Sequence, residues 1–101
     1  MYIVFSVPAS VKQIENKNVR EGENVEEYCS VTAGIPYPTV MWTNAKTGEH
    51  IKENPLNITN INRTHAGEYR CTANNTCGEA STTMNINVQC KETIRSFYMN
   101  V

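Results

Sequence analysis

The chain has 101 residues, of which 40% are hydrophobic, and its formal net charge is −1. This size favours one domain with a modest core, and the near-neutral charge, without a run of lysine and arginine, argues against a nucleic-acid surface. No apolar stretch approaches the roughly 18 residues that a membrane-spanning helix needs, so we expect no membrane insertion. We interpret the chain as part of a longer protein, with a leading segment at 1–7, a domain at 8–90 and a tail or linker at 91–101.

Short runs in which apolar and polar residues alternate predict β-strands. They cover residues 24–33, 39–45, 55–61, 67–73 and 79–88. Turn-forming residues separate them, at residues 20–24, 34–38, 46–49, 62–67 and 74–79. Many short strands joined by turns, without a stretch of helical periodicity, predict an all-β sandwich or barrel.

Tyr69 and Cys71 are two positions apart, so in a strand their side chains face the same side. Cys29 lies in an earlier predicted strand, and Trp42 lies between the two cysteines. This order and spacing resembles the immunoglobulin superfamily, specifically the I-set and C2-set domains of adhesion molecules and receptor ectodomains. The resemblance covers residues 8–88.

The resemblance implies an immunoglobulin-like β-sandwich of two antiparallel sheets, A-B-E and G-F-C, in Greek-key topology. It also implies a disulfide between Cys29 on strand B and Cys71 on strand F, with the ring of Trp42 packed against it. Tyr69 would be the tyrosine corner, with its hydroxyl bonded to backbone near the E–F turn. Gly67 would permit the tight turn into strand F.

Three departures from the family pattern carry expectations of their own. His65 stands where the family usually has an aspartate that pairs with a basic residue, so we expect no such ion pair. Glu27 shares a strand face with Val25 and Cys29, so it lies near a sheet edge or the strand is locally irregular, because an unpaired buried carboxylate is costly. Residues 49–54 leave room for one strand, either C′ beside C or D beside E, and we favour C′, the C2-set arrangement.

Two further cysteines have no family counterpart. Cys77 lies in the predicted F–G turn, and Cys90 follows strand G. About eleven residues of strand between them span roughly 36 Å, whereas a disulfide needs Cα atoms within about 7 Å. The two are therefore free, or they pair with another domain or chain.

The sequence offers no recognisable active site, metal site or cofactor site. The adjacent Glu26 and Glu27 point to opposite faces of a strand and cannot act as a pair. His50 and His65 stand in no metal-ligand spacing, and no Cys-x-x-Cys occurs. We therefore expect a protein without metal or cofactor that is not an enzyme.

Three Asn-x-Thr sequons begin at Asn57, Asn62 and Asn74 and are candidate glycosylation sites. Such sequons also arise by chance in a chain rich in asparagine and threonine. Alternation turns Asn57 outward from strand E, and the other two fall in turns, so all three are predicted to be accessible. With the implied disulfide, these sites favour a glycoprotein in an extracellular or cell-surface setting.

The function that we favour is a non-catalytic extracellular binding or adhesion module that engages protein partners, including a second copy of itself or neighbouring immunoglobulin domains. The alternative is a structural I-set module of an intracellular filament protein. An enzyme remains a third possibility, and it would need an unrecognised metal or cofactor.

Strands C, F and G are predicted to present a nearly uncharged outer face with one arginine and one exposed methionine, residue types enriched at interfaces. The candidate binding residues on this face and on the adjoining B–C loop are Ile35, Tyr37, Met41, Thr43, Arg70, Thr72, Thr83 and Asn85. Asn74 is expected beside this face but not on it, and Asn57 on the opposite A-B-E face. The plainer interpretation is a soluble sheet surface without a partner.

Overall fold

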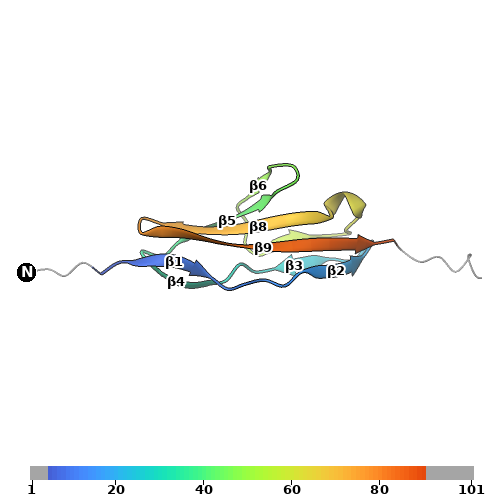
Figure 1. The fold of residues 1–101 in the computed structure, drawn as a ribbon. Coiled ribbons are helices and arrows are strands. Elements are labelled where there is room, and N and C mark those ends of the chain that lie inside the picture. The colour runs from blue at the N-terminus through green and yellow to red at the C-terminus, as the bar shows by residue number, and fades with distance from the viewer. Residues whose placement is uncertain (1–4, 91–101) are drawn as a thin grey trace, which may run out of the picture.

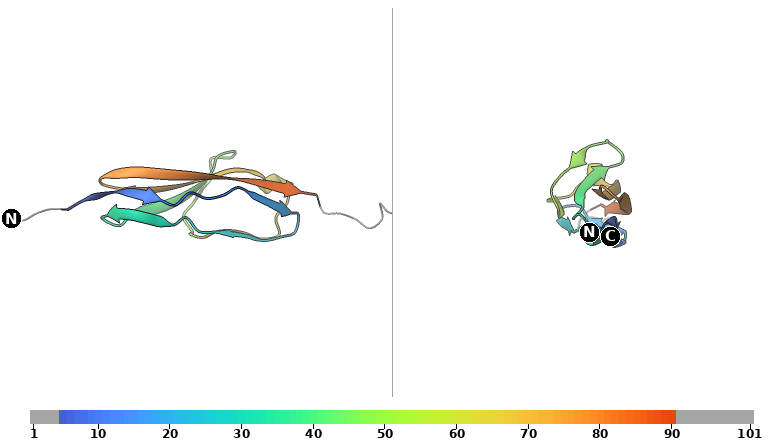
Figure 2. Two further views of the ribbon diagram at one scale, coloured as in Figure 1. Left: turned by 60° about the horizontal axis from the view of Figure 1, so that its bottom comes forward. Right: turned by 90° about the vertical axis from the view of Figure 1, so that its left-hand side faces the viewer.

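Two layers of β-strands face each other in the computed structural model, which describes residues 5–90 (Figure 1). The elements are, in chain order, β1 (Val7–Val11), β2 (Lys17–Arg20), β3 (Val25–Glu27), β4 (Val31–Ile35), β5 (Thr39–Asn44), β6 (His50–Ile51), β7 (Leu56–Ile58), the 3₁₀ helix η1 (Arg63–His65), β8 (Gly67–Asn75) and β9 (Gly78–Gln89). β1 begins and β9 ends at opposite ends of the long axis (Figure 2). The predicted all-β sandwich is confirmed, and the expected tail at 91–101 lies outside the described residues.

The first layer is a five-stranded sheet with the strand order β2-β9-β8-β5-β6. β6 pairs with β5 through Trp42–Ile51 and Thr43–His50, which confirms strand C′. β2 runs parallel to β9, so the expectation of two purely antiparallel sheets is wrong. The reason is that the chain continues from β1 into β2 without reversing, and both strands run in the same direction as β9 (Figure 1). β2 therefore pairs with β9 in parallel.

The second layer consists of two separate antiparallel ladders, β1–β4 and β3–β7. The single strand predicted at 24–33 is broken, because β3 ends at Glu27 and β4 begins at Val31. The Glu27 carboxylate lies 2.7 Å from Lys17 Nζ, and its side chain is 21% exposed. Of the two alternatives expected for Glu27, the structure shows the locally irregular strand. The ion pair with Lys17 offsets the cost of the partly buried charge.

The side chain of Asn54 replaces the missing strand pairing at this break. Its Oδ1 accepts hydrogen bonds from the Cys29 amide (2.9 Å) and from Trp42 Nε1 (3.3 Å), and its Nδ2 donates to the Cys29 carbonyl (2.9 Å). The next residue, Pro55, has no N–H with which to extend the β7 ladder. One amide side chain thus satisfies three polar groups around two buried residues.

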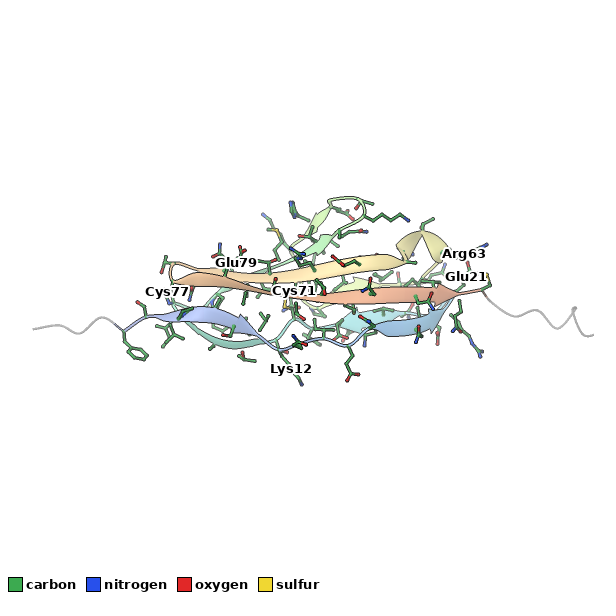
Figure 3. All side chains as sticks on the ribbon, viewed as in Figure 1. Lys12, Glu21, Arg63, Cys71, Cys77 and Glu79 are labelled. Atoms are coloured by element: carbon green, nitrogen blue, oxygen red, sulfur yellow. A yellow bond between two sulfur atoms is a disulfide. The ribbon has the colours of Figure 1, made fainter. Side chains whose placement is uncertain are left out.

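A disulfide between Cys29 and Cys71, with their Cα atoms 6.2 Å apart, joins the two layers (Figure 3). Trp42 lies directly opposite Cys71 in the β5–β8 register and is fully buried. The remaining buried residues of the core cluster are Val25, Leu56, Ile61, Tyr69, Met84, Ile86 and Val88. The core therefore surrounds the cross-link between the layers.

The turn before β8 is held by a chain of side-chain and backbone hydrogen bonds. The Tyr69 hydroxyl donates to the His65 carbonyl (2.7 Å), which is the geometry of a tyrosine corner. The His65 Nδ1 atom accepts a hydrogen bond from the Asn62 amide (3.0 Å), and the Asn62 side chain accepts one from the Thr64 amide (2.9 Å). His65 therefore caps η1, which the sequence predicted only as a turn.

Two glycines occupy positions that disfavour any side chain. Gly67 has φ +130° at the start of β8, in the region that L-residues rarely adopt. Gly34 has φ +152°, and a Cβ there would lie 2.4 Å from Pro38 Cγ. Gly67 thus permits the turn into β8, and Gly34 permits the close approach of the loop before β5.

Replacing Asn54 by alanine should lower the free energy of unfolding by about 2–4 kcal/mol, because the Trp42 indole and the Cys29 backbone lose their partners. Asn54→Asp keeps the accepting oxygen but sets a carboxylate oxygen against the Cys29 carbonyl, so it should also destabilise the fold. Urea denaturation measures both variants, with Asn57→Ala, an exposed residue on β7, as the matched control. Equal stability of Asn54→Ala and the control would contradict this role.

Burial raises the pKa of the Tyr69 hydroxyl above its ordinary value of 10.0, and the charge of Glu49 adds to the shift. Tyr69 ionises at a lower pH in the unfolded chain than in the folded one, so its ionisation favours unfolding. The stability that the neutral hydroxyl contributes is therefore complete below pH 10.0 and is lost as the pH rises through the raised pKa. Tyr69→Phe should cost about 1 kcal/mol at neutral pH, and its deficit should shrink in alkali. Denaturation at about pH 7 and about pH 10.5 tests this in a Cys77→Ala, Cys90→Ala background; a constant deficit would contradict it.

Candidate functional site

The outer side of the five-stranded sheet carries side chains in rows, because paired residues on neighbouring strands stand side by side. Three rows cross β5, β8 and β9, and they are Thr39–Asn74–Glu79, Met41–Thr72–Ser81 and Thr43–Arg70–Thr83. Alternating positions on the same strands, such as Trp42, Cys71 and Met84, are buried in the core. The three rows, with His50 of β6 and Asn85 of β9, are called the C–F–G face below.

A groove of about 300 Å³ lies in the C–F–G face. It is lined by Thr39, Met41, Thr43, His50, Thr72, Asn74 and Glu79. Met41 belongs to the middle row and lines the groove, and its side chain is half-buried rather than exposed as expected. The groove therefore combines apolar methionine surface with hydroxyl, amide and carboxylate groups.

The charges of the C–F–G face are separated along the sheet. Glu79 is exposed in the first row, and Arg70 is exposed in the third. Four residues of strand place the two rows about 13 Å apart. Within residues 5–90 neither side chain has an ion-pair partner. Glu68, half-buried, lies two positions before Arg70 on the same side of β8.

Six of the eight candidate binding residues lie on the C–F–G face. Met41, Thr43 and Thr72 line the groove, and the others on the face are Arg70, Thr83 and Asn85. The other two do not line the groove. The first of these is Ile35, which was expected in the B–C loop. It belongs to β4 instead and pairs with Val7 in the second layer. Tyr37 follows β4 and is 79% exposed.

Asn74 lies on the C–F–G face, so its predicted position beside the face is wrong. β8 continues to Asn75, which makes residue 74 part of a strand rather than of a turn. Asn74 is exposed, pairs with Thr39 and Glu79 and lines the groove. The other two sequon asparagines are also exposed, Asn57 on β7 of the second layer and Asn62 at the start of η1.

Asn75 is a structural residue that the sequence analysis missed. Its Nδ2 donates to the carbonyls of Val7 (2.8 Å) and Pro36 (2.9 Å), and its Oδ1 accepts from the amides of Cys77 (2.9 Å) and Gly78 (3.1 Å). The two short-range bonds are typical of asparagine in turns and could have been expected. The two long-range bonds, which tie the β8–β9 turn to β1 and to the loop before β5, left no local signal.

Cys77 and Cys90 are both exposed and carry free thiols. Cys77 lies in the β8–β9 turn, at the end of the molecule where β1 begins, far from Glu21 and Arg63 at the opposite end (Figure 3). β9 between the two cysteines is an unbroken strand of 12 residues.

Neither a metal centre nor a membrane-spanning helix is found in the described part of the chain. No group of three or more His, Cys, Asp or Glu side chains within residues 5–90 could hold a metal ion. No helix among these residues is long and apolar enough to cross a membrane.

A disulfide between two β layers, a buried tryptophan opposite one of its cysteines and a tyrosine corner together define an immunoglobulin-like sandwich. A family model described as "Immunoglobulin domain" matches residues 8–75. The chain belongs to this family.

Similar proteins include cell adhesion molecules and titin. Human IgLON family member 5 is 37% identical over 76 residues, which cover 74% of this chain and 22% of the relative, so the chain spans about a fifth of that protein. Titin of Drosophila melanogaster is 32% identical over 100 residues, or 86% of this chain and 0% of titin after rounding. In the solved complex "Dpr11 IG1 bound to DIP-gamma IG+IG2", one chain aligns at a TM-score of 0.76 and 22% identity, covering 83% of this chain and 49% of that one, which shows the fold alone.

Peptide mapping of the unreduced protein should show one intrachain link, Cys29–Cys71, and two thiols that react with an alkylating agent. The reason is that β9 holds Cys77 and Cys90 about 40 Å apart. A Cys77–Cys90 peptide from the monomer would mean that β9 is broken. A peptide that links either thiol to a second chain would show that the pair serves assembly.

Proposed function

We propose that this chain is a non-catalytic binding module of an extracellular or cell-surface protein and that it engages protein partners through the C–F–G face. A fold of this kind presents a surface and does not by itself determine the ligand. The observation that supports this surface is the groove around Met41, flanked by Glu79 and Arg70, two exposed charges without ion-pair partners among residues 5–90.

The arrangement of charges favours a second copy of the same chain as one partner. A two-fold axis through the middle row would place the first row of one copy against the third row of the other. Glu79 would then face Arg70 of the second copy, and Arg70 would face Glu79. The same contact would bring the two Met41 side chains together at the centre, where interface cores are most apolar.

The extracellular setting rests on chemistry outside this face. The Cys29–Cys71 disulfide is typical of oxidising compartments, and the three exposed sequons are suited to glycosylation in the secretory pathway. The similarity to IgLON family member 5 agrees with this setting. The similarity to titin favours the second candidate, a structural module of an intracellular filament protein.

Intact-mass analysis of the native protein under non-reducing conditions distinguishes the two settings. A formed disulfide together with glycans at any sequon supports the extracellular module. Reduced Cys29 and Cys71 without glycans would support the intracellular one.

Sedimentation of the unglycosylated chain tests docking through the C–F–G face. Arg70→Glu alone and Glu79→Arg alone should each weaken self-association about tenfold, because each places like charges opposite each other. An equimolar mixture of the two variants should associate again, since every contact then joins opposite charges. Met41→Glu should also weaken association, and melting is recorded because this side chain is half-buried.

The control is Asn57→Glu, which places a charge on β7 in the other layer. It should leave association unchanged. If the control abolishes association while the variants at Arg70 and Glu79 associate like the parent, docking occurs through the second layer. If the mixture of the two charge variants does not recover, the two-fold arrangement is wrong.

A further inference from the structure

Two adjacent asparagines at the end of β8 differ in what their side chains do. Asn75 uses its amide in four hydrogen bonds, two donated and two accepted. Asn74 is exposed, and its side chain makes no hydrogen bond within residues 5–90. Asn74 begins the sequon Asn74-Asn75-Thr76, and Thr76 is exposed in the turn that follows. The residue whose Nδ2 must be free for glycosylation is therefore the one that the structure leaves free.

The position of Asn74 directs any attached group onto the groove. Its cross-strand neighbours are Thr39 and Glu79, whose Cβ atoms lie about 5 Å from its own in such pairs. Thr72, two positions earlier on the same side of β8, lies about 7 Å away. All four side chains line the groove, so the first sugar would lie at its border.

The lining of the groove is chemically suited to a carbohydrate. Three threonine hydroxyls and the Glu79 carboxylate can form hydrogen bonds with sugar hydroxyls. Met41 offers apolar surface for the C–H face of a sugar ring. A glycan that lies here also covers the middle row, which is the centre of the docking surface proposed above.

We propose that an N-linked glycan on Asn74 occupies this groove and prevents docking through the C–F–G face, so that occupancy of one sequon regulates binding. The effect of the glycan on docking rests on the proposed function, whereas its position in the groove does not. In the attachment step, Asn74 Nδ2 attacks the anomeric carbon of a lipid-diphosphate-linked oligosaccharide. A C–N bond forms, the anomeric C–O bond to the diphosphate breaks, the amide loses one proton and the lipid diphosphate leaves.

The sequon at Asn57 provides a matched comparison within the same chain. Asn57 is exposed on β7, in the other layer of the sandwich, and it does not line the groove. A glycan there should leave the C–F–G face accessible. Thr76→Ala removes the sequon at Asn74 without changing Asn74, and Thr59→Ala does the same for Asn57.

The first experiment measures where the glycan lies and needs no partner. The chain is secreted from mammalian cells in a Cys77→Ala, Cys90→Ala background, and glycopeptide mass analysis gives the occupancy of Asn74. A Thr72→Cys probe in the groove should react with a bulky maleimide about tenfold more slowly than in the same protein carrying Thr76→Ala, because thiol reactivity depends on exposure. A Thr83→Cys probe, on the same sheet but outside the groove lining, should react equally in both.

The second experiment measures the consequence for docking by sedimentation of the secreted protein. Thr76→Ala should self-associate at least as tightly as the unglycosylated chain, whereas the parent and Thr59→Ala should not associate. An unmodified Asn74, or equal reaction of the Thr72→Cys probe with and without its sequon, overturns the inference. Slow reaction of the probe without any association of Thr76→Ala overturns the proposed docking and leaves the glycan in its groove.

Discussion

The covalent link between Cys29 and Cys71 holds together a sandwich whose second layer is interrupted. Cys29 lies where β3 has ended and β4 has not begun, so this layer is anchored at the point where its own strand pairing is missing. Closing a loop across a sequence separation of 42 contributes about 4 kcal/mol in the chain-entropy model. Trp42, directly opposite Cys71, then fills the space between the layers that the disulfide fixes.

At the points where strands do not pair, asparagine side chains form the hydrogen bonds that a neighbouring strand would otherwise supply. An amide side chain offers the same donor and acceptor as a peptide group. Asn54 uses both on the backbone of Cys29, and Asn75 uses both to join the β8–β9 turn to two other segments. Short strands can therefore form a complete hydrogen-bond network, and within residues 5–90 no buried side-chain nitrogen or oxygen lacks a partner.

Local patterns predicted the elements that alternate regularly and missed those that depend on distant partners. Spacing around Trp42 and Tyr69 was sufficient to predict the family, because these residues repeat its core motif. The sequence alone does not distinguish a sheet edge from a broken strand at Glu27, since the pairing with Lys17 spans residues that local periodicity does not connect. The groove was not predictable, because it depends on β8 reaching Asn75 and on the register that places Asn74 beside Glu79.

Two edge strands of the sandwich, β6 and β7, are too short to serve as templates for a strand of another chain. β6 has two residues and β7 has three, and β7 directly follows Pro55, so neither offers a long row of free peptide groups. Long exposed edges are the usual templates for adding a strand from another chain. In the proposed docking through the C–F–G face, a partner would contact side chains of the sheet surface rather than extend the sheet beside β6 or β7.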